Sequence, residues 1–219
     1  MSTQPAPSAA KKDPPAQPSS SSRRLLKHYQ PRRDEDEAKR LRMLREILET
    51  IALTVLMFLV FRFAVQNYRV DGLSMLPTLQ DQQYIVVNRA AYLFHPPERG
   101  DIIVFAYPVD PSQDYIKRII GLPGDRVQVS REGVVSVNGV ELHEPYVKDT
   151  TNPYPPTDIQ LGPDQYFVLG DNRGDSSDSR VWGPVPRQNI IGQAWFVYWP
   201  LNEFHAIPGP GTTFSNIGP

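Results

Sequence analysis

The sequence contains no cysteine. This absence excludes a disulfide framework, a thiolate zinc site and a cysteine nucleophile, and it makes folding independent of the redox state of the compartment. Histidine is also scarce, and none of the four histidines has the spacing of a metal site or of a catalytic triad. We therefore expect neither a metal nor a cofactor, and serine chemistry would need a base other than histidine.

Charge of one sign is not in large excess. The net charge is -1; residues 1–50 carry 11 Lys/Arg against 7 Asp/Glu, and the remainder carries 12 against 17. No basic stripe is interleaved with aromatic residues, so nucleic-acid binding is not expected. The 219 residues suffice for one compact domain of about 150 residues, a tail and an anchor.

Large apolar residues are almost missing from the first 22 positions, which are rich in Pro, Ser, Ala and Gln. This composition predicts a disordered cytoplasmic tail, which we assign to residues 1–32. Strong helix formers and opposite charges at helical spacing follow, with Leu41, Leu44 and Leu48 available for one face. We assign residues 33–46 to a charged juxtamembrane helix.

The one long apolar run, IALTVLMFLVFRFAV, begins at Ile51. Residues 47–66 give a span of 20 residues, which at about 1.5 Å each matches the roughly 30 Å hydrocarbon core of a bilayer. A buried core helix is one alternative, and a cleaved signal peptide is another, although the fifty-residue preamble is too long for it. An uncleaved transmembrane anchor is preferred. The basic cluster before it favours a cytoplasmic N-terminus and an extracytoplasmic C-terminal part.

Convincing helical periodicity is missing after the anchor. Short β-branched and aromatic runs alternate there with Gly, Pro and Asn turns, and they predict strands at 84–87, 101–105, 115–120, 126–129, 134–137, 166–169 and 194–199. Asn138-Gly139 predicts a type I′ hairpin turn. The five prolines in residues 143–164 predict an irregular excursion. We expect a mainly β, antiparallel domain over residues 67–203, with at most short helices, and a C-terminal tail over 204–219.

Two segments carry candidate chemistry. Gly72 lets the backbone bend sharply two residues before Ser74, and Pro77 stiffens the exit; an ordinary serine in a turn is the alternative. Lys117 lies in an apolar strand, where alternation places it on one face with Tyr115. A desolvated lysine amine is one of the few bases that can activate a serine without histidine, although a strand-edge lysine in water is the commoner case.

A third segment, GDNRGDSSDSRVWGP over residues 170–184, gathers small polar and charged residues after an apolar strand. It loosely matches a calcium loop. However, if Asp171 is the first ligand, the twelfth position is Trp182, where an EF-hand needs a bidentate Glu. A polar scaffold is the better interpretation.

Taken in order after an anchor, these segments resemble the signature boxes of bacterial type I signal peptidases. The resemblance covers roughly residues 47–200, and several long boxes in order are more specific than one short motif. The boxes are SMLPTL from Ser74, RGDIIVF from Arg99, YIKRIIGLPGD from Tyr115 and GDNRGDSSDSRVWGPV from Gly170.

The resemblance implies a role for each matching residue. Ser74 would be the nucleophile and Lys117 the general base, with Ser176 bonded to the lysine amine to orient it. Two supporting ion pairs would hold the last box against the lysine strand: Asp178 with Arg180, and Asp171 with Arg118. The pockets for small substrate side chains at positions -1 and -3 would be lined by Met75, Leu79, Tyr115 and Ile116.

Two positions depart from part of that family. Gly72 stands where some members have a serine whose hydroxyl helps to hold the oxyanion, so the backbone N–H of Ser74 is a candidate donor and the second donor is open. Losing one such donor elsewhere costs about 2.7 to 4 kcal/mol. Gly174 stands where many members carry an acidic residue, which affects only the detail of that loop.

The resemblance implies a serine endopeptidase of the plasma (inner) membrane that removes signal peptides from exported preproteins through an acyl-enzyme. Its partners would be preproteins, the lipid bilayer and, transiently, the secretion translocon. A self-cleaving repressor of the SOS type uses a related serine and lysine, but it should carry a helix-turn-helix instead of a span. A non-catalytic membrane-anchored adhesion domain is the other alternative, and it predicts no acylation by a mechanism-based serine reagent.

Overall fold

A computed structural model describes residues 33–147, 151–209 and 213–217 of the chain. Its first element is a single helix, α2 (Arg33–Ala64), of 32 residues. By length and composition, this helix could cross a membrane. The predicted charged helix and the predicted span therefore belong to one continuous element, which ends two residues before the predicted end of the span. The predicted tail over residues 1–32 lies outside the described residues.

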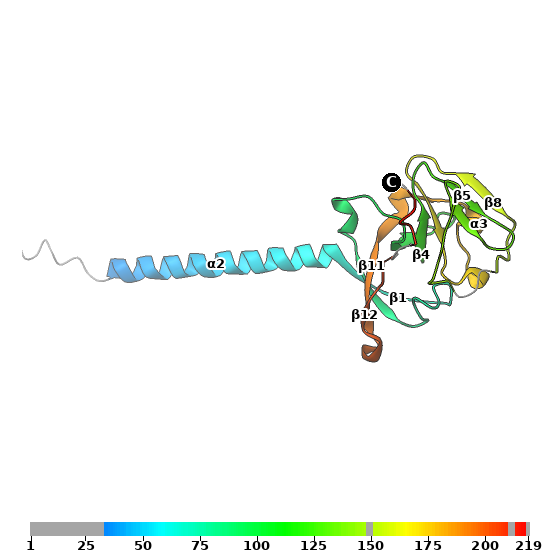
Figure 1. Ribbon diagram of the computed structural model, residues 1–219. Coiled ribbons are helices and arrows are strands. Elements are labelled where there is room, and N and C mark those ends of the chain that lie inside the picture. Colours follow the sequence, from blue (N-terminus) through cyan, green and yellow to red (C-terminus); the bar gives the residue numbers. More distant parts are fainter. Residues whose placement is uncertain (1–32, 148–150, 210–212, 218–219) are drawn as a thin grey trace, which may run out of the picture. The chain divides into compact units, whose positions relative to one another are not determined.

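The larger of two antiparallel sheets has its strands in the order β1-β2-β11-β3-β4-β9-β10, with β12 paired to β11. Figure 1 labels β1, β4, β11 and β12 of this sheet. The bounds of these strands are β1 (Val65–Arg69), β2 (Tyr84–Asn88), β3 (Ile102–Ala106), β4 (Asp114–Gly121), β9 (Gln165–Leu169), β10 (Val185–Pro186), β11 (Ile190–Trp199) and β12 (His205–Ala206). Strand β4, which carries Lys117, lies inside the sheet between β3 and β9.

The smaller sheet has the order β7-β6-β5-β8. Its strands are β5 (Arg126–Val129), β6 (Val135–Val137), β7 (Val140–Glu141) and β8 (Thr157–Gln160), and β5 and β8 are labelled side by side in Figure 1. The predicted hairpin turn is confirmed: Asn138 and Gly139 have φ values of 52° and 80°, and Val137 pairs with Val140. Positive φ at both positions is what a type I′ turn requires.

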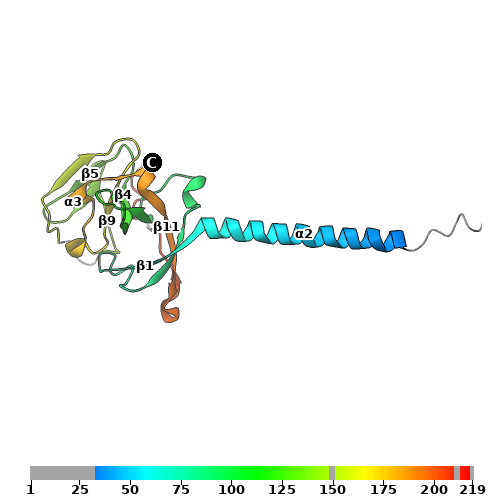
Figure 2. The same cartoon turned by 180° about the vertical axis from the view of Figure 1, so that it is seen from behind.

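Short helices complete the described part of the chain. They are the α-helix α3 (Ser179–Trp182) and the 3₁₀ turns η1 (Ala91–Leu93), η2 (Arg173–Asp175), η3 (Arg187–Asn189) and η4 (Leu201–Glu203). Figure 2 shows α3 beside the strands of the domain, seen from behind. The prediction of a mainly β domain with short helices is therefore confirmed for the described residues.

The larger sheet buries both of its faces. Along β3, Ile102 and Val104 pack into one apolar cluster with Val87, whereas Ile103 and Phe105 pack into another with Val168. Since successive side chains of a strand point to opposite faces, an unbroken apolar run such as IIVFA indicates burial on both sides. This double packing fixes β3 and its neighbour β4.

Four strands lie where the sequence predicted none. Two of them, β10 and β12, have only two residues each, and β12 falls inside the predicted C-terminal tail. Strand β1 follows α2 directly, and its residues Val65–Arg69 pair with β2 in spite of the polar sequence VQNYR. Strand β8 lies inside the region predicted as an irregular excursion, where it pairs with β5 over four residues. The excursion prediction is therefore wrong for Thr157–Gln160, because backbone pairing with β5 outweighs the nearby prolines.

Candidate active site

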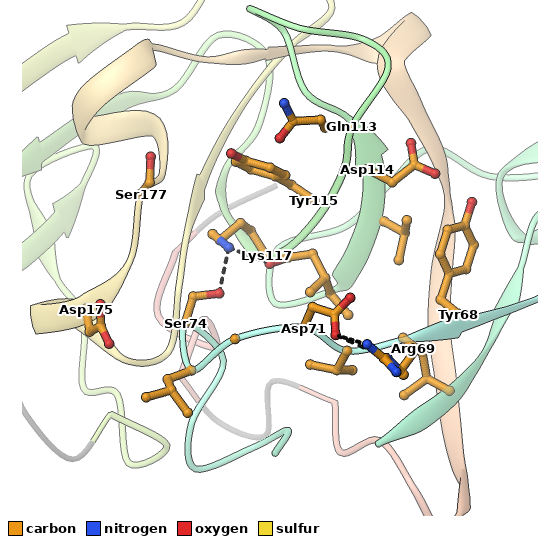
Figure 3. A pocket seen from close by; sticks show the side chains of 16 residues that line it. Tyr68, Arg69, Asp71, Ser74, Gln113, Asp114, Tyr115, Lys117, Asp175 and Ser177 are labelled. Carbon is orange, nitrogen blue, oxygen red and sulfur yellow. Dashed lines mark hydrogen bonds and ion pairs between the residues drawn. The ribbon is translucent and has the colours of Figure 1, made fainter. Parts of the chain in front are cut away.

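An open cavity of about 420 Å³ brings Ser74 and Lys117 together (Figure 3). One wall is the chain from Tyr68 to Ser74, and the opposite wall is the stretch from Gln113 to Lys117. Asp175 and Ser177 line it near Ser74, as Figure 3 shows, and Ile85 and Val104 add apolar surface. Segments about 40 and 100 residues apart along the sequence thus meet at one place.

Ser74 lies in the tight turn after β1, where local residues set its position. Gly72 has a φ of 99°, which an L side chain rarely adopts, and its N–H donates to Asp81 Oδ1 at 2.8 Å. The Leu79 N–H donates to the Met75 carbonyl at 2.9 Å and closes the turn. Met75 and Leu79 are buried in the core, so they anchor the turn from below. The backbone at Ser74 is therefore held on both sides.

Lys117 presents its amine to Ser74. Its Nζ lies 2.7 Å from Ser74 Oγ and donates to the Ile116 carbonyl at 2.8 Å. The residue is 4% exposed. Burial lowers the pKa of Lys117 to about 8, against the carboxylates of Asp178 and Asp171, which raise it. At pH 7 such an amine is neutral in about one molecule in ten, compared with about one in 2,500 at an ordinary pKa of 10.4.

The loop after β9 carries both ion pairs that the resemblance implied. Asp178 Oδ2 lies 2.7 Å from Arg180 Nη2, and Asp171 Oδ2 lies 2.7 Å from Arg118 Nη2. All four side chains are at most 1% exposed. Arg118 follows Lys117 directly on β4, so its pair with Asp171 ties the loop to the lysine strand. Each buried charge is matched by an opposite one, as burial of a charge requires.

Ser176 is buried next to the Asp178–Arg180 pair, and its hydroxyl donates to Asp178 Oδ2 at 2.8 Å. Its expected hydrogen bond to the Lys117 amine stays a prediction. Ser176 also lies against Gly170, where a side chain would have no room.

Contacts that sequence reasoning missed join the loop to the serine turn. The Asn172 N–H donates to the Ser74 carbonyl at 3.0 Å, and the Asn172 side-chain amide donates to the Leu73 carbonyl at 3.1 Å. The Thr78 hydroxyl donates to Asp171 Oδ2 at 2.5 Å. Thr78 and Asn172 lie inside the boxes that carried the resemblance, so the signal for them was their place within those motifs.

The residues expected to line the substrate pockets divide into two pairs. Tyr115 and Ile116 line the cavity. Met75 and Leu79 are 1% and 0% exposed and pack in the apolar cluster with Ile85 and Val104, whose side chains line the cavity. Met75 and Leu79 therefore lie behind the residues that line the cavity. Their packing in the core fixes the turn that carries Ser74.

Gly170→Ala should disturb this site. An added Cβ would collide with Ser176 Oγ and would lie 2.5 Å from the Ser74 carbonyl oxygen. Because the serine turn must shift to relieve the clash, we expect activity to fall about 100-fold, the size of effect that a 1 Å misplacement produces. Peptide cleavage rates and melting curves measure this. Gly209→Ala is the matched control, because nothing lies within 4 Å of its added Cβ; equal activity of the two variants would contradict the expectation.

A mainly β domain in which a serine hydroxyl lies against a buried lysine amine, in an open cavity, has the arrangement of a serine hydrolase that works without histidine. Residues 43–199 match the model of the family described as signal peptidase, peptidase S26. The chain belongs to that family.

Several relatives share most of this length. Signal peptidase I of Leptolyngbya laminosa is 42% identical over 211 residues, which cover 90% of this chain and 93% of the relative. Probable signal peptidase I-1 of Synechocystis sp. is 39% identical, with 74% of this chain and 85% of the relative covered. Signal peptidase IB of Staphylococcus aureus is 36% identical over 184 residues, which cover 74% of this chain and 94% of the relative.

Proposed function

We propose that this protein is a membrane-anchored endopeptidase that removes N-terminal signal peptides from exported preproteins. Ser74 is the nucleophile and Lys117 the general base. The observation that carries the proposal is the 2.7 Å separation of Lys117 Nζ and Ser74 Oγ, with the buried amine at the wall of an open cavity. The signal peptidases to which the chain is similar supply the substrate class.

The substrate binds as an added strand along β4. Residues Asp114–Arg118 pair with β3 on one side, whereas the pairing with β9 on the other side begins only at Arg118. On the side away from β3, the backbone of Tyr115–Lys117 therefore faces the cavity with no described strand paired to it. An extended peptide can form hydrogen bonds with the backbone groups of these residues. Apolar side chains of Val70, Ile85 and Val104 line the same space and suit small apolar residues before the scissile bond.

The hydrogen bonds of Lys117 direct its lone pair. A neutral amine has two N–H groups and one lone pair, and one N–H is used by the Ile116 carbonyl. With that bond made, the lone pair can accept the Ser74 proton as Oγ attacks the substrate carbonyl carbon. Collapse of the tetrahedral intermediate breaks the peptide C–N bond, and Lys117 gives the proton to the departing amine. An acyl-enzyme on Ser74 results, and Lys117 then activates water to hydrolyse the ester.

The oxyanion needs donors at the cavity. The Ser74 N–H is one candidate, as in other hydrolases in which the nucleophile's own N–H contributes. Gly72 supplies no hydroxyl, and its N–H is already bound to Asp81.

The helix α2 is proposed as the anchor, with the N-terminus in the cytoplasm and the catalytic domain on the outer side. Holding enzyme and preprotein in one membrane raises their effective concentration. Two-dimensional confinement would thus compensate for weak binding by a short cleavage sequence. The ion pairs Asp171–Arg118 and Asp178–Arg180 and the hydroxyl of Ser176 act as the supporting frame of the lysine.

A cleavage assay tests this function. Detergent-solubilised full-length protein is incubated with a purified preprotein, and the product is identified by N-terminal sequencing and intact mass. We expect one cut, after the residue that ends the signal peptide, and a transient mass adduct of the signal peptide on Ser74 after rapid acid quench. A preprotein with a bulky residue at position -1 is the matched control and should stay intact. No cleavage of the normal preprotein, or equal cleavage of both, would refute the proposal.

A further inference from the structure

The segment His143–Val147, between β7 and β8, contributes two partly buried side chains, those of Glu144 and Tyr146. The Glu144 carboxylate accepts from Arg173 Nη1 at 2.8 Å and from Arg173 Nη2 at 2.6 Å. The Tyr146 hydroxyl donates to the same carboxylate at 2.7 Å. The exposed fractions of the Arg173 and Glu144 side chains are 2% and 9%. Such a bidentate pair, joined by a third donor, is geometrically specific rather than a casual surface contact.

Tyr146 also covers Arg118, whose side chain is 1% exposed. Its ring lies over Arg118 with 4.1 Å from the guanidinium carbon to the ring centroid. Arg118 donates to both oxygens of Asp171, at 2.9 and 2.7 Å, and to the Gly100 carbonyl at 2.9 Å. Stacking on an aromatic face suits a weakly hydrated guanidinium, and both side chains of the ion pair beneath the ring are 1% exposed.

Arg118 and Arg173 both bind the loop that contacts the serine turn. Arg173 Nε donates to the Gly170 carbonyl at 3.0 Å, and Arg118 fixes Asp171. The next residue, Asn172, binds the carbonyl of Ser74. The connection from Glu144 to Ser74 therefore runs through Arg173 to the Gly170 carbonyl, along the backbone to Asn172, and across the Asn172 hydrogen bond to the Ser74 carbonyl. Neither Glu144 nor Tyr146 lines the cavity.

We propose that Tyr146 and Glu144 are positioning residues for the peptidase reaction, which act by holding Arg118 and Arg173 against the loop that fixes Ser74 beside Lys117. The role rests on the proposed function. It gives the proline-rich region before β8 a task in catalysis, although that region is remote in sequence from the reacting residues. An error of about 1 Å in the position of a reacting group can cost about 100-fold in rate.

The pair that Tyr146 covers also acts on Lys117 electrostatically. The carboxylates of Asp178 and Asp171 face it from the loop and raise its pKa, burial lowers it, and the Tyr115 ring lies 5.5 Å from its Nζ. Arg180 and Arg118 pair with those carboxylates. If water reaches Arg118 and weakens its bond to Asp171, the carboxylate is less neutralised. The pKa of Lys117 then rises, and less neutral amine is present at a given pH.

Steady-state kinetics of the full-length enzyme from pH 6 to 10 test the role, with Tyr146→Phe and Tyr146→Ala compared at a temperature well below each melting point. Tyr146→Phe keeps the ring over Arg118 and should stay within about threefold of wild type. For Tyr146→Ala we expect a kcat about 100-fold lower at pH 7, with little change in KM, and an acid limb moved to higher pH by about 0.5 unit or more. Raising the pH should therefore restore part of its rate.

Val137→Ala is the stability control, because it removes a fully buried side chain of β6 in the smaller sheet. It should lower the melting temperature and leave kcat and the pH limb unchanged. If Tyr146→Ala does not fold, Tyr146→Leu carries the test with the same expected shift of the limb.

A wild-type kcat and limb in the folded alanine or leucine variant, or an effect on KM alone, would overturn the positioning role. So would an equal loss in the Val137 variant. Failure of the wild-type enzyme to cut any preprotein would count against the proposed function instead, so the two failures are distinguishable.

Discussion

Replacing Ser74 by alanine is expected to abolish processing of a preprotein. The hydroxyl is the only nucleophile that the proposed mechanism uses. It lies 2.7 Å from Lys117 Nζ, the base that takes its proton. Loss of a serine nucleophile elsewhere lowers kcat by roughly 10⁶, because oxyanion stabilisation and binding alone retain little of the rate. Time courses of cleavage in detergent, followed over hours at high enzyme concentration, measure the remaining rate.

Ser136→Ala is the matched control for this variant. Ser136 is a partly buried serine of β6, in the smaller sheet, and its substitution removes the same hydroxyl group without touching the cavity. Its rate should equal that of wild type within about twofold, because Ser136 does not line the cavity and lies away from the features that give large mutational effects. A Ser74→Ala enzyme with a tenth or more of wild-type turnover would refute the nucleophile assignment.

Lys117→Met should lower the rate about 10³- to 10⁴-fold. Methionine has similar length and no base, so the Ser74 proton has no acceptor; general base catalysis typically contributes 10² to 10⁴. The folded protein should nevertheless be at least as stable as wild type near pH 7. There the amine is mostly charged, and its burial opposes folding. Cleavage rates and thermal melting of the same preparation test both statements.

Arg126→Met is the corresponding control, because it removes a cation from an exposed pair with Asp158. Exposed pairs contribute about 0 to 1 kcal/mol, so activity and melting temperature should hardly change. A Lys117→Met enzyme that keeps a tenth of the activity, or that unfolds while the Arg126 variant does not, would contradict the role and environment assigned to the lysine.

The strands with alternating or unbroken apolar residues could be predicted from the sequence because their local pattern and their burial agree. The hairpin at Asn138-Gly139 is the clearest case, since the turn residues themselves require the geometry that the structure shows. Strand β1 could not be predicted: its sequence VQNYR has little apolar character, and it is a strand because β2 supplies partners for its backbone. Strand β8 is similar, since β5 determines it across more than 25 residues of chain.

The meeting of Ser74 with Lys117 was expected on the strength of the motifs, and the ion pairs of Asp171 and Asp178 followed from the same resemblance. Local sequence could not separate Tyr115 and Ile116, which line the cavity, from Met75 and Leu79, which are buried behind it. Which of these side chains reach the cavity depends on the direction in which the turn leaves β1. Glu144 and Tyr146 gave no local signal either, because their partners lie about 30 residues away.

The central claim is that Lys117 is held with a pKa low enough to act as the base for Ser74. Nuclear magnetic resonance titration of the lysine Cε and Hε signals, in full-length protein selectively labelled at lysine and assigned with Lys117→Met, measures that pKa directly. We predict a value of about 8 that coincides with the acid limb of kcat/KM. An amine that titrates near 10.5, or a rate that ignores its titration, would contradict the account.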